Sequence, residues 1–304
     1  MKERGDARFR ADSGEGGLGE KVNSLSHQHA LHLPRPPWGQ GKARNHLISM
    51  ILLRSLIFNI CFYTLLVAMM IIGLPILFMR RRVVQDWTRL WARLSLVLLD
   101  RICHLKVEFR GVEHLPQGAA LVAAKHQSFL ETFAMILVVK DFTFVLKREL
   151  TFIPLFGWYI RATEQIAIDR AKRGNALAQV VKGARKIFAQ NRQLLIFPEG
   201  TRRPVGAPPN YKAGVAHIQA DTDVVCIPVA LNSGLFWRRR HFRRRPGTVV
   251  IEFLTPIAPG LGKEAFMRRL EERIETATDR LVAEACAKDP SLACLTLAGH
   301  ATSA

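Results

Sequence analysis

The feature that most restricts how this chain can fold is an uncharged, mostly apolar run from Ser55 to Met79. Because a helix of about 20 apolar residues spans the core of a bilayer, the run is long enough to enter a membrane. A cleaved secretory signal fits poorly, since the run is long for one and Arg80 to Arg82 follow it in place of a small-residue cleavage site. We therefore expect a membrane anchor, and the core helix of a soluble domain is the less favoured alternative.

A second helix is expected after this run. Gly73 and Pro75 permit a turn or kink, and residues 83–103 have the pattern of an amphipathic helix that carries Trp87 and Trp91. Two arrangements remain open, a helical hairpin half-sunk in one leaflet and a single crossing. Arginines flank the run on both sides, so the charge bias between its two ends does not choose an orientation. Residues 46–104 are predicted to be a membrane-anchoring hairpin or a transmembrane segment.

Short apolar runs alternate with helical segments in the rest of the chain, which indicates a single α/β sandwich. We expect this domain over residues 105–286, followed by a tail at residues 287–304. Residues 1–45 are rich in Gly, Ser, His, Arg and Pro, and are predicted to be a disordered basic extension. The expected strands are Lys106–Arg110, Ala119–Ala124, Phe142–Leu146, Gln165–Ile168, Gln193–Phe197, Val224–Ala230 and Thr248–Phe253. The expected helices are Phe129–Val139, a short one before Gln165, Ala171–Gln190, Ala213–Ala220 and Gly262–Ala285.

A polar island from Lys125 to Glu131 interrupts the apolar sequence at a predicted strand-to-helix turn. Catalytic groups and ligands gather at such turns in α/β sheets, at the carboxyl ends of the strands. His126 is the predicted general base, and Glu131, about one helical turn later, is predicted to fix its tautomer by a hydrogen bond. Ser128 is expected to cap the helix rather than to act as a nucleophile.

The His126 and Glu131 pair is weak evidence by itself. With ten histidines and 25 acidic residues among 304, an acidic residue five positions after some histidine is expected about once by chance. A solvent-exposed histidine beside a surface helix cap is the alternative interpretation. The order and context of further motifs decide between the two.

Cationic residues follow several predicted strands and suit a phosphate ligand, because a guanidinium donates two parallel hydrogen bonds to phosphate oxygens. Arg202 follows the strand that ends at Phe197, and Arg170 follows the one that ends at Ile168. Lys147 and Lys212 are further candidates by the same placement. Any of the four is alternatively a solvated charge.

Four motifs, in order, resemble those of the glycerolipid acyltransferase family, most closely the bacterial 1-acylglycerol-3-phosphate O-acyltransferases. The resemblance extends from Lys106 to about Glu284, and its first motif has Glu131 where the family more often has Asp. The third motif, Pro-Glu-Gly-Thr-Arg, is matched in full. The four matching segments are His126–Glu131, Gln165–Arg170, Pro198–Arg202 and Val224–Ala230.

The resemblance implies an enzyme that transfers a fatty acyl group from acyl-CoA or acyl carrier protein to the free hydroxyl of 1-acylglycerol 3-phosphate (lysophosphatidate), giving phosphatidate for phospholipid synthesis. It also implies a helical hairpin, a bacterial inner membrane location with the catalytic domain on the cytoplasmic side, and no cofactor. The third motif, with Glu199, Gly200, Thr201 and Arg202, helps to bind the acceptor. For Glu199, contact with the glycerol hydroxyl, bracing of an arginine and a structural role all remain open.

Two other functions remain open. The acceptor can be a different lipid, such as glycerol 3-phosphate, another lysophospholipid or an acylated amine lipid. A membrane-tethered lipid-binding protein without catalysis is the other alternative, which the intact His126 disfavours. Five cysteines, an odd number without paired metal spacing, argue against a metal site and a full disulfide framework and fit a reducing compartment.

The net charge of +19 favours an anionic membrane surface as a partner, since each Lys or Arg near such a surface contributes about 1 kcal/mol. The densest basic cluster extends from Trp237 to Arg245, and its aromatics, Trp237 and Phe242, are expected at the membrane interface. Nucleic acid is the rival partner for such a cluster. We do not expect it, because no nucleic-acid-binding motif accompanies the cluster.

Overall fold

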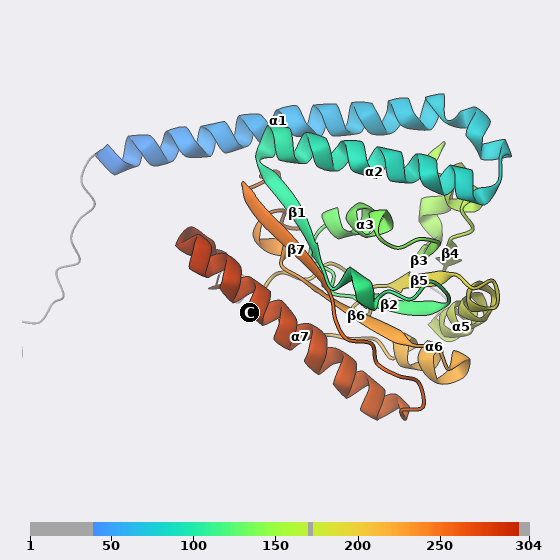
Figure 1. The fold of residues 1–304 in the computed structure, drawn as a ribbon. Helices are drawn as coiled ribbons and strands as arrows, with labels where there is room; N and C mark the ends of the chain where they lie inside the picture. Colours follow the sequence, from blue (N-terminus) through green and yellow to red (C-terminus); the bar gives the residue numbers. More distant parts are fainter. Residues whose placement is uncertain (1–38, 170–172, 298–304) are drawn as a thin grey trace, which may run out of the picture. The chain divides into compact units, whose positions relative to one another are not determined.

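The computed structural model describes residues 39–169 and 173–297 (Figure 1). Contacts divide the chain into residues 1–44 and residues 45–304, and the following description concerns the second unit. The predicted extension at residues 1–45 falls almost entirely outside the described part of the chain, as does the end of the predicted tail.

Two long helices, α1 (Gly39–Ile72) and α2 (Arg81–Cys103), are joined by a 3-10 turn, η1 (Leu74–Phe78). A glycine is required where α1 ends, because a Cβ on Gly73 would lie 2.3 Å from Nε1 of Trp87 and 2.4 Å from the hydroxyl of Tyr159. The same Trp87 nitrogen donates a hydrogen bond to the carbonyl of Met69 at 3.0 Å, which fastens α2 to the end of α1. The predicted turn and second helix are therefore present.

The domain is built on a seven-stranded sheet with the order β1-β7-β6-β2-β5-β3-β4. Neighbouring strands are parallel except β6 and β7, which are antiparallel. The strands are β1 (Leu105–Arg110), β2 (Ala120–Ala124), β3 (Phe142–Lys147), β4 (Ile166–Ile168), β5 (Gln193–Ile196), β6 (Cys226–Leu231) and β7 (Gly247–Phe253). All seven predicted strands are present, with ends shifted by one or two residues.

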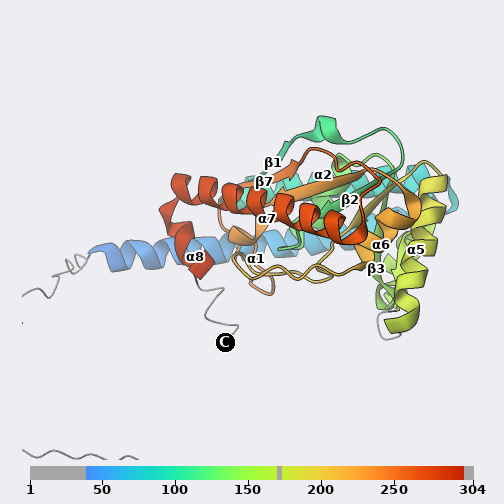
Figure 2. The same cartoon turned by 90° about the horizontal axis from the view of Figure 1, so that it is seen from below.

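Helices cover both faces of this sheet, so the predicted α/β sandwich is confirmed. The central strand β2 is buried throughout, and its side chains alternate between two cores, as the two-residue period of a strand requires. Val122 contributes to the core under α2 and α3, whereas Leu121 contributes to the core under α5, α6 and α7. Figures 1 and 2 show these two layers. The helices are α3 (Leu130–Ala134), α4 (Phe156–Ala162), α5 (Arg173–Ala189), α6 (Gly214–Thr222), α7 (Lys263–Lys288) and α8 (Ala293–Leu297).

One predicted helix is shorter than expected. Instead of a single helix over Phe129–Val139, α3 ends at Ala134 and a 3-10 turn, η3 (Met135–Leu137), follows. Most apolar residues of this segment, Phe133 and Met135 among them, are buried beneath α2, where the side chain of Arg89 donates a hydrogen bond to the carbonyl of Ile136. Tertiary packing thus replaces the hydrogen bonds of a longer helix.

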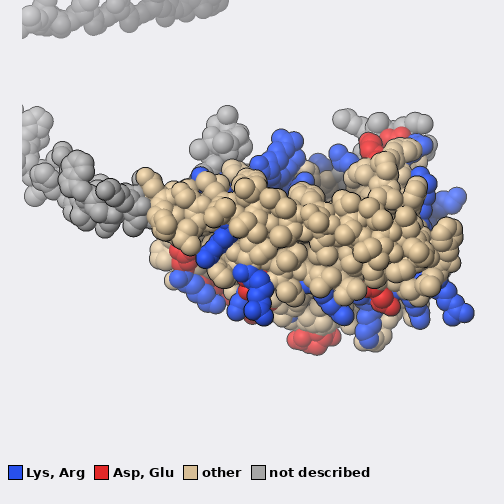
Figure 3. Space-filling model, turned by 90° about the horizontal axis from the view of Figure 1, so that it is seen from above, with Lys and Arg blue, Asp and Glu red and all other residues tan. Residues whose placement is uncertain are grey.

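Helix α1 packs one face against the domain. Ser55, Phe58, Phe62 and Met69 are buried, at the three-, four- and seven-residue spacing of one helical face. The opposite face is apolar and exposed, and within the described residues α1 is the one helix long and apolar enough to cross a membrane, over Asn45–Ile72. Figure 3, which looks onto this side, shows a largely uncharged surface with Lys and Arg near its edges. The exposed side chains include Leu53, Leu56, Ile57, Ile60, Tyr63, Val67, Ile71 and Ile72.

The prediction that Trp237 lies at a membrane interface is wrong. Its indole is buried between α1 and α3, with the ring of Phe58 5.6 Å away. The guanidinium of Arg244 lies 4.2 Å from the Trp237 ring and donates to Oδ1 of Asn59 at 2.9 Å. Burial lowers the pKa of Arg244 to about 10, and the contacts with Trp237 and with Asn59 of α1 offset part of its lost hydration. Phe242 alone of the two aromatics is exposed.

Candidate active site

His126 lies two residues after the end of β2, at the edge of the sheet where the strand ends. The hydrogen bond from the amide of Lys125 to the carbonyl of Val229 continues the pairing of β2 with β6 up to this point. The imidazole is stacked on the ring of Phe197, with 4.0 Å between centroids and 16° between planes. One face of the imidazole is therefore covered by the residue that follows β5.

Glu131 is fully buried and holds the histidine by its Nδ1. Oε1 of this carboxylate is 3.0 Å from Nδ1 of His126, and it also accepts hydrogen bonds from the amides of Gln127 and Ser128 at 2.8 and 2.6 Å. Oε2 accepts a hydrogen bond from the hydroxyl of Ser233 at 2.8 Å. Since an ionised carboxylate only accepts hydrogen bonds, Nδ1 must carry the proton and Nε2 the lone pair.

The longer side chain of Glu131, compared with the family's Asp, therefore reaches the imidazole. Ser128 is completely buried, and its hydroxyl accepts a hydrogen bond from the amide of Leu130 at the start of α3. This contact is of the capping kind, although the residue that precedes the helix is Phe129. The Ser128 hydroxyl is engaged in the turn that shapes the histidine loop.

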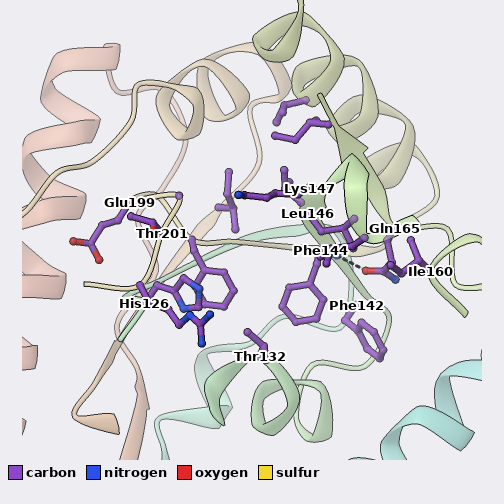
Figure 4. A pocket seen from close by; sticks show the side chains of 18 of the residues that line it. His126, Thr132, Phe142, Phe144, Leu146, Lys147, Ile160, Gln165, Glu199 and Thr201 are labelled. Atoms are coloured by element: carbon purple, nitrogen blue, oxygen red, sulfur yellow. Dashed lines mark hydrogen bonds between the residues drawn. The ribbon is translucent and has the colours of Figure 1, made fainter. Parts of the chain in front are cut away.

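A cavity of about 1060 Å³ opens beside His126. Its walls are mostly apolar, with Phe142, Phe144 and Ile160 among the lining residues. Figure 4 shows Lys147 pointing into the space beside His126 and Thr201, with the phenylalanines on the far side. The cavity thus combines a histidine, cationic side chains and a large apolar volume.

The structure brings most of the predicted binding residues to this one cavity. Gly200 turns the chain after β5 with a positive φ of 65°, which carries the third motif past His126. Arg170 lies outside the described residues, so its predicted role remains a prediction. The predicted residues that line the cavity are His126, Lys147, Glu199, Gly200, Thr201, Arg202 and Lys212.

The role of Glu199 in binding the acceptor stays a prediction, and its carboxylate has a partner on another loop. Its side chain is buried, and Figure 4 shows the carboxylate directed away from His126 and the other labelled lining residues. Oε1 is 3.2 Å from Nζ of Lys125, so the carboxylate braces a lysine rather than an arginine. Burial raises the pKa of Glu199, and the neighbouring Lys125 opposes this shift.

Sequence reasoning missed several residues of the site. Arg239 lines the cavity and donates to the carbonyl of Arg202 at 3.0 Å, although its sequence context placed it in the basic cluster. Ser233 gave no signal, because it meets Glu131 only through the fold. Lys125 gave a usable sequence signal, since a lysine that directly follows a buried strand needs a partner of opposite charge.

Within the described residues, no group of three or more His, Cys, Asp or Glu side chains is arranged to hold a metal ion. Cys61, Cys103 and Cys226 are free thiols.

Comparisons with known proteins agree with these features. Residues 106–232 match the family model described as Acyltransferase. The 1-acyl-sn-glycerol-3-phosphate acyltransferase of Pseudomonas aeruginosa is 33% identical over 214 residues, which cover 69% of this chain and 81% of that protein. The 1-acyl-sn-glycerol-3-phosphate acyltransferase alpha of Mus musculus is 28% identical over 247 residues, 77% of this chain and 86% of that protein.

The fold is shared with a solved structure as well. The crystal structure of the 1-acyl-sn-glycerophosphate acyltransferase PlsC from Thermotoga maritima matches with a TM-score of 0.64 and 23% identity, over 75% of this chain and 96% of that one. Sequence similarity at this length, together with the ordered motifs around His126, establishes the relationship. The chain belongs to the family of 1-acyl-sn-glycerol-3-phosphate acyltransferases.

Proposed function

We propose that the protein transfers an acyl group from a thioester donor to the free hydroxyl of 1-acylglycerol 3-phosphate and so forms phosphatidate. The observation that carries this proposal is the His126 to Glu131 hydrogen bond at the edge of a cavity with both cationic and apolar lining. The names of the relatives in Pseudomonas aeruginosa and Mus musculus support the same acceptor.

The proposed reaction is a direct transfer. Nε2 of His126 takes the proton from the acceptor hydroxyl as its oxygen attacks the thioester carbonyl carbon. The tetrahedral intermediate then collapses, the carbon–sulfur bond breaks, and the thiolate leaves and recovers the proton from the imidazolium. Glu131 stabilises that imidazolium and keeps the ring in the tautomer that leaves Nε2 free. No acyl-enzyme is required.

The acceptor phosphate is proposed to bind among Arg202, Lys147, Lys212 and Arg239, which line the same cavity as His126. A phosphate monoester carries up to two negative charges, and charge-assisted hydrogen bonds to it are about twice as strong as neutral ones. Arg170 is proposed as a further ligand on the grounds of its motif. The apolar walls suit the acyl chains of donor and acceptor.

Membrane attachment is proposed to occur with α1 in the plane of one leaflet. The buried face of α1 contacts the domain from Ser55 to Met69, which is about 21 Å of helix at 1.5 Å per residue. A helix perpendicular to the bilayer would draw this part of the domain into the hydrocarbon. An in-plane helix instead buries the exposed apolar face, while the basic residues at its edges meet anionic headgroups. We propose that this membrane is a bacterial inner membrane and that the domain lies on its cytoplasmic side.

The activity is tested with the full chain in detergent micelles. Radiolabelled acyl-CoA and acyl carrier protein are supplied in turn with 1-acylglycerol 3-phosphate, glycerol 3-phosphate, lysophosphatidylcholine and lysophosphatidylethanolamine. We expect phosphatidate as the main product, and its formation should be at least about 100-fold slower with His126→Ala. Preferred acylation of any other acceptor, or no transfer to any, would overturn the proposed function, and the comparison of donors decides between CoA and carrier protein.

A further inference from the structure

The residue before His126 is a buried cation that joins three distant segments. Lys125 is 3% exposed, and its Nζ lies 2.7 and 2.9 Å from the two oxygens of Glu275 and 3.2 Å from Oε1 of Glu199. Lys125 follows β2, Glu199 belongs to the loop after β5, and Glu275 lies on α7. A single ammonium group therefore ties the histidine loop, the third motif and the C-terminal helix together.

Tyr211 extends this cluster to another part of the cavity. Its hydroxyl donates to Oε1 of Glu275 at 2.7 Å, and its ring lies 5.9 Å from Nζ of Lys125. Burial raises the pKa of Tyr211, so the phenol keeps its proton and remains a donor. The next residue, Lys212, lines the cavity, and its amide donates to the carbonyl of Pro198 at 2.9 Å.

The loop that carries Arg202 is attached to His126 by its backbone as well. The amide of Arg203 donates to the carbonyl of His126 at 2.8 Å, and the ring of Phe197 stacks on the imidazole. These contacts hold the two ends of the loop, and Glu199 lies between them. The bond from Glu199 to Lys125 fixes the middle of the loop.

Buried ions are costly unless each has well-placed partners. Here one ammonium meets two carboxylates and an aromatic ring, and of these four residues Glu199 alone is among those that line the cavity. Replacing such a cluster by apolar side chains is often neutral or stabilising, so a stability role alone does not account for it. The geometry of the cluster, which joins three segments at one ammonium group, instead suits a role in positioning the loops.

We propose that Lys125 is a positioning residue that, through Glu199 and Glu275, sets the acceptor-binding loops with Arg202 and Lys212 at a fixed distance from His126. This inference rests on the proposed function, because the loops matter only if they bind the acceptor. It makes α7, which lies outside the segment matched by the family model, part of the acceptor site. The donor, which reacts at the thioester, does not depend on this brace.

The kinetic test uses Lys125→Met and Glu275→Gln in the full chain. We expect the apparent acceptor KM to rise about tenfold or more, the scale on which small misplacements act, with a donor KM that stays near that of the parent protein. Glu284→Gln is the matched control, since Glu284 also lies on α7 but pairs with Arg110 and Arg280 at the surface. This control should change neither KM.

Non-additivity provides a second kinetic readout. Glu199→Gln should raise the acceptor KM in the parent protein and have a much smaller effect in Lys125→Met, because the two residues act through one contact. Equal effects in both backgrounds would argue that Glu199 touches the acceptor directly.

Amide hydrogen exchange tests the brace without catalysis and guards against a variant that fails to fold. The amides of Arg203 and Lys212 should exchange faster in Lys125→Met and in the milder Glu275→Gln, and at parent rates in Glu284→Gln. Parent-like exchange and acceptor KM in a folded Glu275→Gln and Lys125→Met would overturn the inference. If the parent protein acylates none of the acceptors, the proposed function fails, while the exchange rates still decide whether the brace exists.

Discussion

Nδ1 of His126 lies 3.0 Å from Oε1 of Glu131, and that carboxylate is buried with hydrogen bonds to both of its oxygens. The backbone amides of Gln127 and Ser128 and the hydroxyl of Ser233 supply the other donors. The orientation of the imidazole is therefore fixed before any substrate enters. Mutations of this pair should therefore act on the reaction through Nε2, the nitrogen that is proposed to take the proton.

Replacing His126 by Ala should lower kcat by about 100-fold or more, the usual scale for loss of a general base. Among the residues that the structure describes, the ring contributes its stacking on Phe197 and one hydrogen bond, with Glu131, so the protein should still fold. Steady-state rates with saturating donor and acceptor measure the effect, and circular dichroism checks the fold. Near-parent turnover in folded His126→Ala would rule out the base.

Glu131→Gln and Glu131→Asp separate charge from shape. The amide oxygen of Gln can still accept from the backbone amides, but the neutral side chain no longer stabilises the imidazolium, so much of the activity should be lost. Asp keeps the charge on a shorter stem and should retain a measurable part. Ser233→Ala removes one donor to the carboxylate and should cost less than Glu131→Gln. A Gln variant as active as the parent would leave Glu131 a purely structural role in the turn.

Much of the fold follows from the sequence because its signals are local. Segments of four to seven residues, most of them apolar, predicted the strands, and the turn at Gly73 predicted the helix pair. The sheet order did not follow, since parallel neighbours can lie far apart along the chain: Leu105 in β1 pairs with Gly247 in β7, 142 residues later. The length of α3 was also missed, because packing beneath α2 overrides helix propensity there.

The candidate site shows the same division. His126 and Glu131 are close in sequence, so their contact was predictable. Lys125 and Glu275 are 150 residues apart, and no periodicity connects them. Trp237 and Arg244 were expected at a surface because their neighbours are basic, yet the fold buries both against α1. A charge cluster in a sequence does not reveal which of its members face inward.

The orientation of α1 predicts different outcomes for two of its neighbouring apolar residues. Phe58 is fully buried, so Phe58→Ala should destabilise the domain by about 3–5 kcal/mol. Ile60 is 59% exposed on the other face. Ile60→Ala should therefore leave the melting temperature in detergent unchanged. Thermal unfolding in detergent measures the stability of both variants. Vesicle flotation measures membrane binding, which Ile60→Ala should weaken. Equal destabilisation by both changes would contradict a helix with one domain-facing side.

The last prediction separates phosphate recognition from membrane attraction among the arginines. Arg202→Lys keeps the charge but loses the paired hydrogen bonds of the guanidinium, so it should raise the apparent acceptor KM. Arg239 lines the cavity beside Arg202, so we count it among the proposed phosphate-binding residues. Arg239→Gln should therefore also raise the acceptor KM.

Arg240 and Arg243 are exposed members of the basic cluster and provide the matched comparison. Changing both to Gln should weaken binding to anionic vesicles, most strongly at low salt, and leave the acceptor KM in detergent near its parent value. Both quantities are measured for every variant. If the double change Arg240→Gln and Arg243→Gln raises the acceptor KM in detergent while Arg202→Lys does not, the acceptor phosphate binds at the basic cluster instead. The third motif would then serve to position His126 and not to bind the phosphate.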